Sequence, residues 1–260
     1  MTTPRSVTPR QWGAMLLTTV ALTHATALVA QTVAPAVTAT TSTEGGEGGE
    51  GGESGVAQVS TDAQSDLNTL ARVDGYLRAG VEAYRQGHIE KAASLVAEAH
   101  EKMSEDLGVH GDTDLATPID GLAKAITDAA PQADVETAYT TAQTAIAEAM
   151  AHVADSAKGQ LTAVYELLNA AAAEYEDSVT DGKVVNPIAW EEAHGFTLAA
   201  ADISRRLADG GVTPAAVKAL EAIQPALDAF VYIDGAPQLL DDALLPATAA
   251  QVEFAALTVK

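Results

Sequence analysis

Two stretches of the chain, YRQGHIEKAASLVAEAH at residues 84–100 and DGKVVNPIAWEEAH at residues 181–194, follow one pattern. In each, a helix-like run ends at a glycine, and a second helix-like run follows that carries Glu-Ala-His near its middle. Glycine ends helices because it adopts the left-handed conformation at no steric cost. The pattern therefore predicts two helical hairpins of similar design, hairpin one at residues 66–107 and hairpin two at residues 160–208.

Apolar residues recur at spacings of three and four through almost all of the chain beyond residue 60, which indicates further helices. These stripes predict shorter helices at 114–157 and C-terminal helices at 213–245, with only a weak helix at 238–244. A proline at 225 is expected to end one of them. Aromatic residues make up only 4% of the chain while Ala is abundant, so the helices must pack closely through small side chains. We expect an all-α, antiparallel helical bundle of about six to eight helices built from hairpins.

The first sixty residues do not look like a folded unit. Two arginines precede an apolar run from Trp12 to Ala30 that ends in small residues, so residues 1–30 fit a secretory signal peptide. An uncleaved membrane anchor is the alternative, because the run approaches the lower limit for spanning a bilayer. Residues 31–60 are rich in Thr and Ala and then in Gly and Glu, which predicts a flexible linker. The remaining residues, 61–260, are expected to form a single helical domain of a periplasmic or secreted protein.

The chain is strongly acidic, with a formal net charge of −22 at pH 7. Residues 61–260 carry 32 acidic and 12 basic residues. Such a field repels phosphate backbones and anionic lipids, so neither nucleic acid nor an anionic membrane surface is an expected partner. It attracts cations, although an acidic surface also serves solubility alone. The absence of Cys excludes disulfides, thiolate metal sites and a thiol nucleophile.

The first Glu-Ala-His contains the main candidate for chemistry, His100. At 100° per residue, His100 falls within about 40° of Val96 and Met103, so it is expected to lie on the buried stripe of its helix. Counting out from the turn of hairpin one, Asp74 comes level with His100 and also points to the apolar side. A buried His facing a buried carboxylate is a metal-ligand pair, a proton-linked pair or a structural hydrogen bond that fixes the hairpin register.

Other acidic and histidine residues are weaker candidates. Glu98 and Glu101 lie on the outer face of the same helix, where they extend a cation site or form only a solvated face. His194 lies on the opposite side of its helix from Phe196, so it is expected to point outward. Glu191 and His194 have the i, i+3 spacing of carboxylate-bridged di-metal bundles, but only one such motif occurs and its angle is outward.

The sequence indicates no enzyme. It contains no Gly-x-Ser-x-Gly elbow, phosphate loop, dinucleotide fingerprint or His-Glu-x-x-His motif, and nothing indicates an organic cofactor. Paired carboxylates occur at Glu191-Glu192 and at Glu174 and Glu176, without a cleft signal. A helical periplasmic peptidase would need a deep polar cleft that joins His194, Glu191 and Glu174.

Residues in both hairpins resemble a known family. The matching positions are Glu174-Tyr175, Val179, Asp181-Gly182, Val184, Asn186, Glu191-Glu192-Ala193 and Phe196 in hairpin two, and Tyr84, Gly87, Ala92 and Glu98-Ala99-His100-Glu101 in hairpin one. They are similar to two patterns in the extracytoplasmic N-terminal region of bacterial high-affinity iron permeases. The Arg-Glu-x-x-Glu motif of the permease itself is absent from this sequence, so the resemblance is to the helical module and not to the membrane permease.

The resemblance implies an all-helical periplasmic module that is associated with iron uptake, with a membrane permease or another periplasmic protein as its partner. We therefore expect a noncatalytic exported protein that binds or helps to deliver metal ions, iron first or another divalent cation. Its expected ligands are His100 and Asp74, with Glu101 or Glu98 as auxiliaries. The alternative is a structural or protein-interaction bundle without a metal site.

Overall fold

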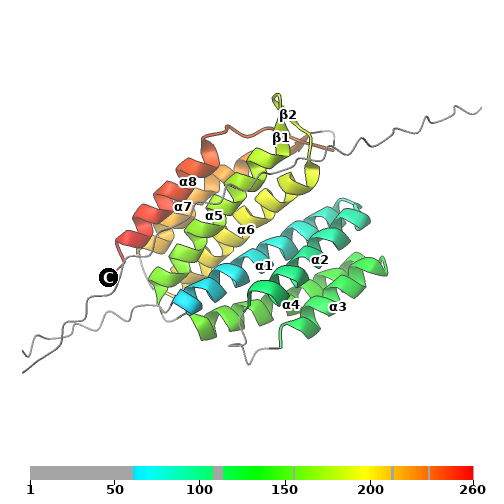
Figure 1. Cartoon of the computed structure of the whole chain (residues 1–260), viewed down its shortest axis with the longest axis horizontal. Helices are drawn as coiled ribbons and strands as arrows, with labels where there is room; N and C mark the ends of the chain where they lie inside the picture. The colour runs from blue at the N-terminus through cyan, green and yellow to red at the C-terminus, as the bar shows by residue number, and fades with distance from the viewer. Residues whose placement is uncertain (1–60, 108–113, 155, 212–213, 234, 260) are drawn as a thin grey trace, which may run out of the picture. The chain divides into compact units, whose positions relative to one another are not determined.

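The computed structural model describes residues 61–107, 114–154, 156–211, 214–233 and 235–259, and these ranges contain eight helices and two short strand pairs (Figure 1). The helices are α1 (Thr61–Arg85), α2 (Ile89–Asp106), α3 (Ala116–Thr127), α4 (Gln132–Val153), α5 (Ala157–Ser178), α6 (Pro187–Asp209), α7 (Pro214–Ala229) and α8 (Leu244–Leu257). The strands are β1 (Val179–Thr180), β2 (Lys183–Val184), β3 (Tyr232–Ile233) and β4 (Ala236–Pro237). The all-α prediction is confirmed. The predicted signal peptide and linker lie outside the described residues.

The helices form two rings of four, each closed by packing between neighbours. Helix α1 packs on α2 and α4, and α3 packs on the same two helices; α5 packs on α6 and α8, and α7 packs on those two. We call α1–α4 the first bundle and α5–α8 the second bundle. Helix α1 joins them, because it packs against α6 and α5 as well (Figure 1). Hairpin one is therefore α1–α2 of the first bundle, and hairpin two is α5–α6 of the second.

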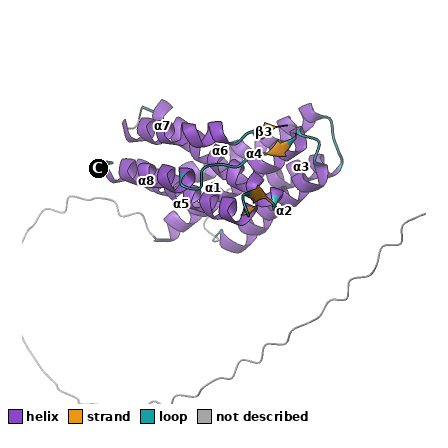
Figure 2. Cartoon of the chain, turned by 90° about the horizontal axis from the view of Figure 1, so that it is seen from above, coloured by secondary structure: helices purple, strands orange, loops and turns teal. Residues whose placement is uncertain are grey.

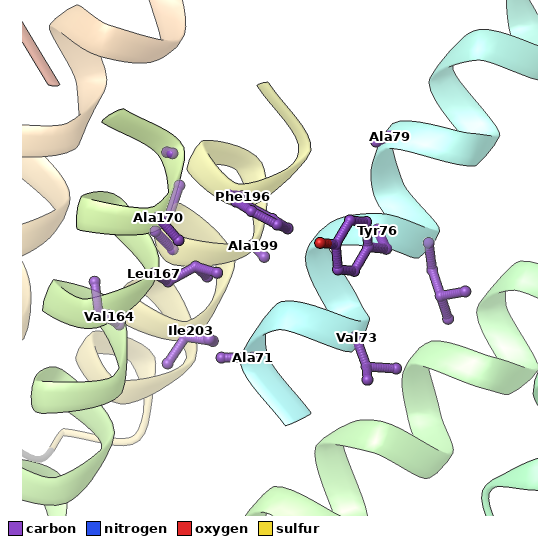
Figure 3. Close-up of a cluster of buried hydrophobic side chains, with 14 of the residues drawn as sticks. Ala71, Val73, Tyr76, Ala79, Val164, Leu167, Ala170, Phe196, Ala199 and Ile203 are labelled. Carbon is purple, nitrogen blue, oxygen red and sulfur yellow. The ribbon is translucent and has the colours of Figure 1, made fainter. Parts of the chain in front are cut away.

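The two bundles meet where α1 and α6 cross at a pair of glycines. A Cβ atom added to Gly195 would lie 2.3 Å from the carbonyl oxygen of Gly75 and 2.7 Å from the Cβ of Ala79. A Cβ added to Gly75 would lie 2.3 Å from the ring of Phe196. Phe196 instead packs edge-on against Tyr76, with ring centroids 4.9 Å apart, in the buried cluster of Figure 3. Without side chains at the two glycines the helix backbones approach closely, and the core between the bundles closes.

The turn of hairpin two follows its sequence signal. Asp181 and Gly182 both have positive φ, 51° and 68°, as a two-residue type I′ turn between β1 and β2 requires. Asn186 then caps α6, because its Oδ1 accepts hydrogen bonds from the backbone N–H of Ile188 at 3.2 Å and of Ala189 at 3.3 Å. Figure 2 shows how little of the described chain is strand. The strand pairs serve as connections between helices and do not add a sheet to the core.

Two expectations for the C-terminal helices are wrong. Helix α7 does not end before Pro225 but continues through it to Ala229. Pro225 is exposed, so the backbone carbonyl that loses its helical partner lies on the solvent side. Residues 238–243 are not helical, and α8 begins only at Leu244. The phenol of Tyr175 donates to the carbonyl of Leu240 at 3.0 Å and accepts from its N–H at 2.7 Å, which withdraws both groups from any helix.

Candidate functional site

Asp74, a predicted ligand, is buried between the bundles but is paired with an arginine. Its side chain is 2% exposed, and Oδ2 accepts from Nε and Nη2 of Arg78 at 3.1 and 3.0 Å. Arg78 Nη2 also contacts Oδ2 of Asp202 on α6 at 2.9 Å. Burial opposes the charge of Arg78, but Asp74 and Asp202 outweigh it, so the pKa of Arg78 is raised above its ordinary value. Asp74 therefore serves an ion-pair network that joins α1 to α6.

His100 lies at the surface and not opposite Asp74. Its side chain is 46% exposed, and Nε2 is 3.5 Å from Oδ1 of Asp120 on α3. The predicted burial of His100 and its predicted pairing with Asp74 are both wrong. Helix α2 packs mainly on α1 and α3, and His100 lies on its α3 side, where Asp120 is itself exposed.

Glu192, the glutamate of the second Glu-Ala-His, lies in a group of three carboxylates with Glu174 of α5 and Glu98 of α2. We call these three residues the carboxylate cluster. Burial raises the pKa of Glu192 to about 8, and Glu174 adds to the shift through its charge and a hydrogen bond, as Glu98 does through its charge. Two carboxyl groups form a hydrogen bond only when one carries a proton. The raised pKa favours a protonated Glu192 that donates this hydrogen bond to Glu174.

Tyr76 of α1 borders the carboxylate cluster from the core side. Its side chain is 6% exposed, and its pKa is raised by burial and then by Glu192, Glu174 and Glu98. The same three carboxylates therefore act on Tyr76 and on one another across four helices. Low polarity on the core side strengthens the repulsion between their charges.

The two Glu-Ala-His motifs are thus linked electrostatically through their glutamates, because the charge of Glu98 contributes to the raised pKa of Glu192. Of the other predicted ligands, Glu101 is exposed on α2. No group of three His, Cys, Asp or Glu side chains within the described ranges is arranged to hold a metal ion. In this structure the carboxylate cluster therefore concentrates acidic groups but is not an assembled metal centre.

Glu191, next to Glu192 in sequence, belongs to a separate buried network. It is 1% exposed, and its Oε1 accepts from Lys91 Nζ at 3.3 Å and from the phenol of Tyr232. The second oxygen, Oε2, is buried without a partner in the part of the chain that the structure describes. Lys91 supplies the opposite charge, so this network ties α2 and β3 to α6. The expectation that Glu191 points outward is wrong.

His194 is packed among aromatic rings, again contrary to expectation. Its ring stacks on Phe230 with centroids 4.9 Å apart and an interplanar angle of 17°, and it lies 5.7 Å from the ring of Trp190. Burial lowers the pKa of His194 to about 4, which Glu82 opposes in part. Helix α6 packs on α1, α5 and α7, so the face opposite Phe196 is covered as well.

The peptidase alternative requires one cleft that joins His194, Glu191 and Glu174, and the structure does not join these three residues. Glu174 is paired with Glu192, Glu191 with Lys91, and His194 with aromatic rings. The sequence did carry a signal for the carboxylate cluster, because Glu174 and Glu192 both belong to the resemblance pattern of hairpin two. Their meeting with Glu98 had no such signal, since it depends on a contact between the two hairpins.

Residues 151–238 match the family model described as the iron permease-associated 4-helix bundle domain. This segment contains α5, α6 and α7 with both strand pairs, so hairpin two resembles the helical module of iron permeases, as predicted. The match is to a domain associated with iron permeases, and it covers about a third of the chain. No curated protein and no solved structure gives a significant match. None of the described helices combines the length and the apolar character that crossing a bilayer requires.

Proposed function

We propose that this protein is a noncatalytic, exported helical module of an iron-uptake system, and that it binds a metal cation at the carboxylate cluster. The match of residues 151–238 to an iron permease-associated domain supports the iron-uptake context. Two of the three cluster residues, Glu174 and Glu192, lie inside that matched segment. A membrane permease or another periplasmic protein is the partner in this proposal.

The observation that carries the cation site is the missing counter-charge at Glu192. Its pKa is raised by burial and by other carboxylates, and no Lys or Arg of the described chain is among the causes. The neighbouring buried carboxylates differ, because Asp74 is paired with Arg78 and Glu191 with Lys91. A cation that replaces the proton between Glu174 and Glu192 would offset their repulsion.

Glu98 is the third ligand in this proposal, and its side chain has to reorient. It is half-buried on α2, and fixing a Glu side chain costs about 1–2 kcal/mol in rotamer entropy. Ionic attraction between a carboxylate and a divalent cation at low effective dielectric exceeds that cost. Carboxylate oxygens favour hard cations over soft ones such as Cu(I). His100, Asp74 and Glu101 are not ligands of this site.

Titration of the exported chain with ferrous and ferric iron, copper and zinc tests the proposal. The fluorescence of buried Trp190, two residues from Glu192, and isothermal calorimetry give independent readouts. We expect the Glu174→Gln, Glu192→Gln double variant to bind at least about tenfold more weakly than the wild type. His100→Ala and Glu101→Gln, which alter exposed groups on α2, are the matched controls and should bind as the wild type does. The proposal fails if the wild type binds no ion more tightly than the double variant does.

Proton release gives a second, independent test. Because the cation takes the place of a shared proton, binding at about pH 7 should release protons. Calorimetry in buffers of different ionisation enthalpy measures that number directly. Binding without proton release would place the cation elsewhere on the acidic surface.

The alternative function is a structural or protein-interaction bundle without a metal site. The observation in its favour is that the described residues contain no assembled group of metal ligands. In that case the Glu174 and Glu192 pair only fixes the packing of α5 on α6. Absence of specific binding in the titrations, with unfolding stability that depends on the same pair, would support this alternative.

A further inference from the structure

Helix α8 exposes an apolar stripe that no described helix covers. Phe254 is 71% exposed and Leu257 is 65% exposed, and Ala247 and Ala250 are exposed on the same side. The spacing of three, four and three residues places all four on one face of the helix. The opposite face is buried on α5 and α7. Large exposed apolar side chains in such a row mark interaction surfaces more often than single exposed residues do.

A hollow continues the stripe toward α7. It has a volume of about 490 Å³ and is bordered by Lys218 and Glu221 of α7 and by Gln251 and Phe254 of α8. Its lining also includes Ala222 and Ala255, which are small side chains that leave room for a larger apolar one. The stripe and the hollow together offer both a protruding ring and a recess beside it.

Charge sets this face apart from the rest of the molecule. Glu253 is the one charged residue among the fourteen of α8, whereas residues 61–260 carry 32 acidic and 12 basic residues. Two copies of the chain repel each other over most of their surfaces, and this repulsion is weakest where charge is absent. Lys218 and Glu221, which both line the hollow, are opposite in charge. A face with a ring, a recess and both signs of charge is self-complementary, as a two-fold interface requires.

We propose that the α8 face, defined as Ala247, Ala250, Phe254 and Leu257 with the adjoining hollow, is the interface of a homodimer. A second copy places its α8 against this one about a two-fold axis, with each Phe254 directed to the other copy's hollow. The interface is small, so the dimer exchanges with monomer and forms as concentration rises. Added salt strengthens the dimer, because it screens repulsion between the two acidic bodies. The dimer does not depend on cation binding at the carboxylate cluster.

Sedimentation velocity of the full chain between about 10 and about 300 µM tests the proposal, since weak interfaces exchange in that range. We expect a shift from monomer to dimer with concentration and a further shift with added salt. Phe254→Glu should weaken the dimer at least about tenfold, because it places a charge at the centre of an apolar interface. Val185→Glu is the matched control, since Val185 is 57% exposed away from α8 and should leave the dimer unchanged. Circular dichroism checks that both variants stay folded.

Cross-linking locates the interface independently, because the chain contains no Cys. Under oxidation, Ala250→Cys should give a disulfide-linked dimer, and Ala133→Cys, at an exposed site on α4, should not. The proposal is overturned by a wild type that stays monomeric over the whole range, or by a dimer that survives Phe254→Glu. It is also overturned if the monomer instead binds nonionic detergent micelles through Phe254, which would indicate an apolar membrane helix as the occupant.

Discussion

Hairpin one and hairpin two carry the same Glu-Ala-His, yet the two histidines have opposite environments. His100 is half exposed beside α3, whereas His194 is stacked on Phe230. The difference comes from the number of neighbours, because α2 packs mainly on two helices and α6 packs on three. A helix sequence indicates which face is most apolar, but the neighbours decide how many of the other faces are covered. The glutamates behave differently again, since Glu98 and Glu192 both approach the space between the hairpins.

The strongest way to break the link between the hairpins is to remove Arg78. Arg78→Ala leaves Asp74 buried without its partner, so we expect a loss of about 3–5 kcal/mol in the free energy of unfolding. Urea denaturation followed by circular dichroism measures it. Arg205→Ala is the matched control, because Arg205 contacts Asp202 at 3.4 Å but is 51% exposed and should contribute less than about 1 kcal/mol. Equal losses in the two variants would contradict a special role for the buried pair.

The glycine crossing separates contacts between hairpins from contacts within one. Gly195→Ala would force a Cβ into the backbone of Gly75, and we expect a loss of about 2–3 kcal/mol by the same urea measurement. Gly80→Ala, inside hairpin one, meets a methyl group of Val96 at 2.8 Å and should cost less, because at Gly195 the added Cβ meets a backbone oxygen at 2.3 Å. Gly121→Ala faces open space and should be neutral or slightly stabilising. A Gly195 variant as stable as the wild type would rule out the close crossing.

The histidines test the comparison directly. His194→Ala removes a ring that packs against Phe230 and Trp190, and we expect it to lower the unfolding free energy by about 2 kcal/mol. His100→Ala removes an exposed side chain and should change stability by no more than about 0.5 kcal/mol. Thermal and urea unfolding of the two variants, side by side, give the ratio. A reversed order would show that His100, and not His194, makes the stabilising side-chain contacts.

The smallest expected effect is in the pH dependence of stability. Burial and two carboxylates raise the pKa of Glu192 from its ordinary value of 4.5 to about 8, so its contribution is complete below pH 4.5 and is lost as pH rises through 8. Because Glu192 is partly exposed, solvent screening leaves about 1 kcal/mol of this effect. Glu192→Gln should flatten the decline between pH 4.5 and about pH 8. The exposed Glu101→Gln should leave the decline as it is, and a curve unchanged in the Glu192 variant would exclude the shared proton.

The acid side of the same curve depends on His194. Its pKa falls from its ordinary value of 6.5 to about 4 on burial, so the unfolded chain takes up a proton that the folded chain does not. The stability that this group supports is therefore present above pH 6.5 and is lost as pH falls toward 4. Hairpin two thus contains two groups whose titration lowers the free energy of unfolding. Protonation of His194 lowers it as pH falls, and deprotonation of Glu192 lowers it as pH rises.

The sequence was sufficient for most of the helices and for the turn of hairpin two. Leu67, Leu70 and Val73 are buried on α1 as their spacing predicts, and Asp181-Gly182 forms the predicted turn. Val217 stands three residues before Leu220, a spacing that predicts one buried face, yet Val217 is 44% exposed because α7 buries mainly its alanines. Local rules also failed at residues 238–243, where Tyr175 binds the backbone of Leu240 from another helix.

What the sequence determined by itself was local: the periodicity of each helix, the glycine turns and the resemblance of hairpin two to iron permease modules. Only the tertiary structure decided which charges meet. Asp74 belongs with Arg78 and Asp202, and Glu98 approaches Glu192, because α1 and α6 cross closely at two glycines. Helical spacing fixes the direction of a side chain about its own axis. It contains no information on which helix lies in that direction, and here the neighbours separate a half-exposed histidine from one that is packed among aromatic rings.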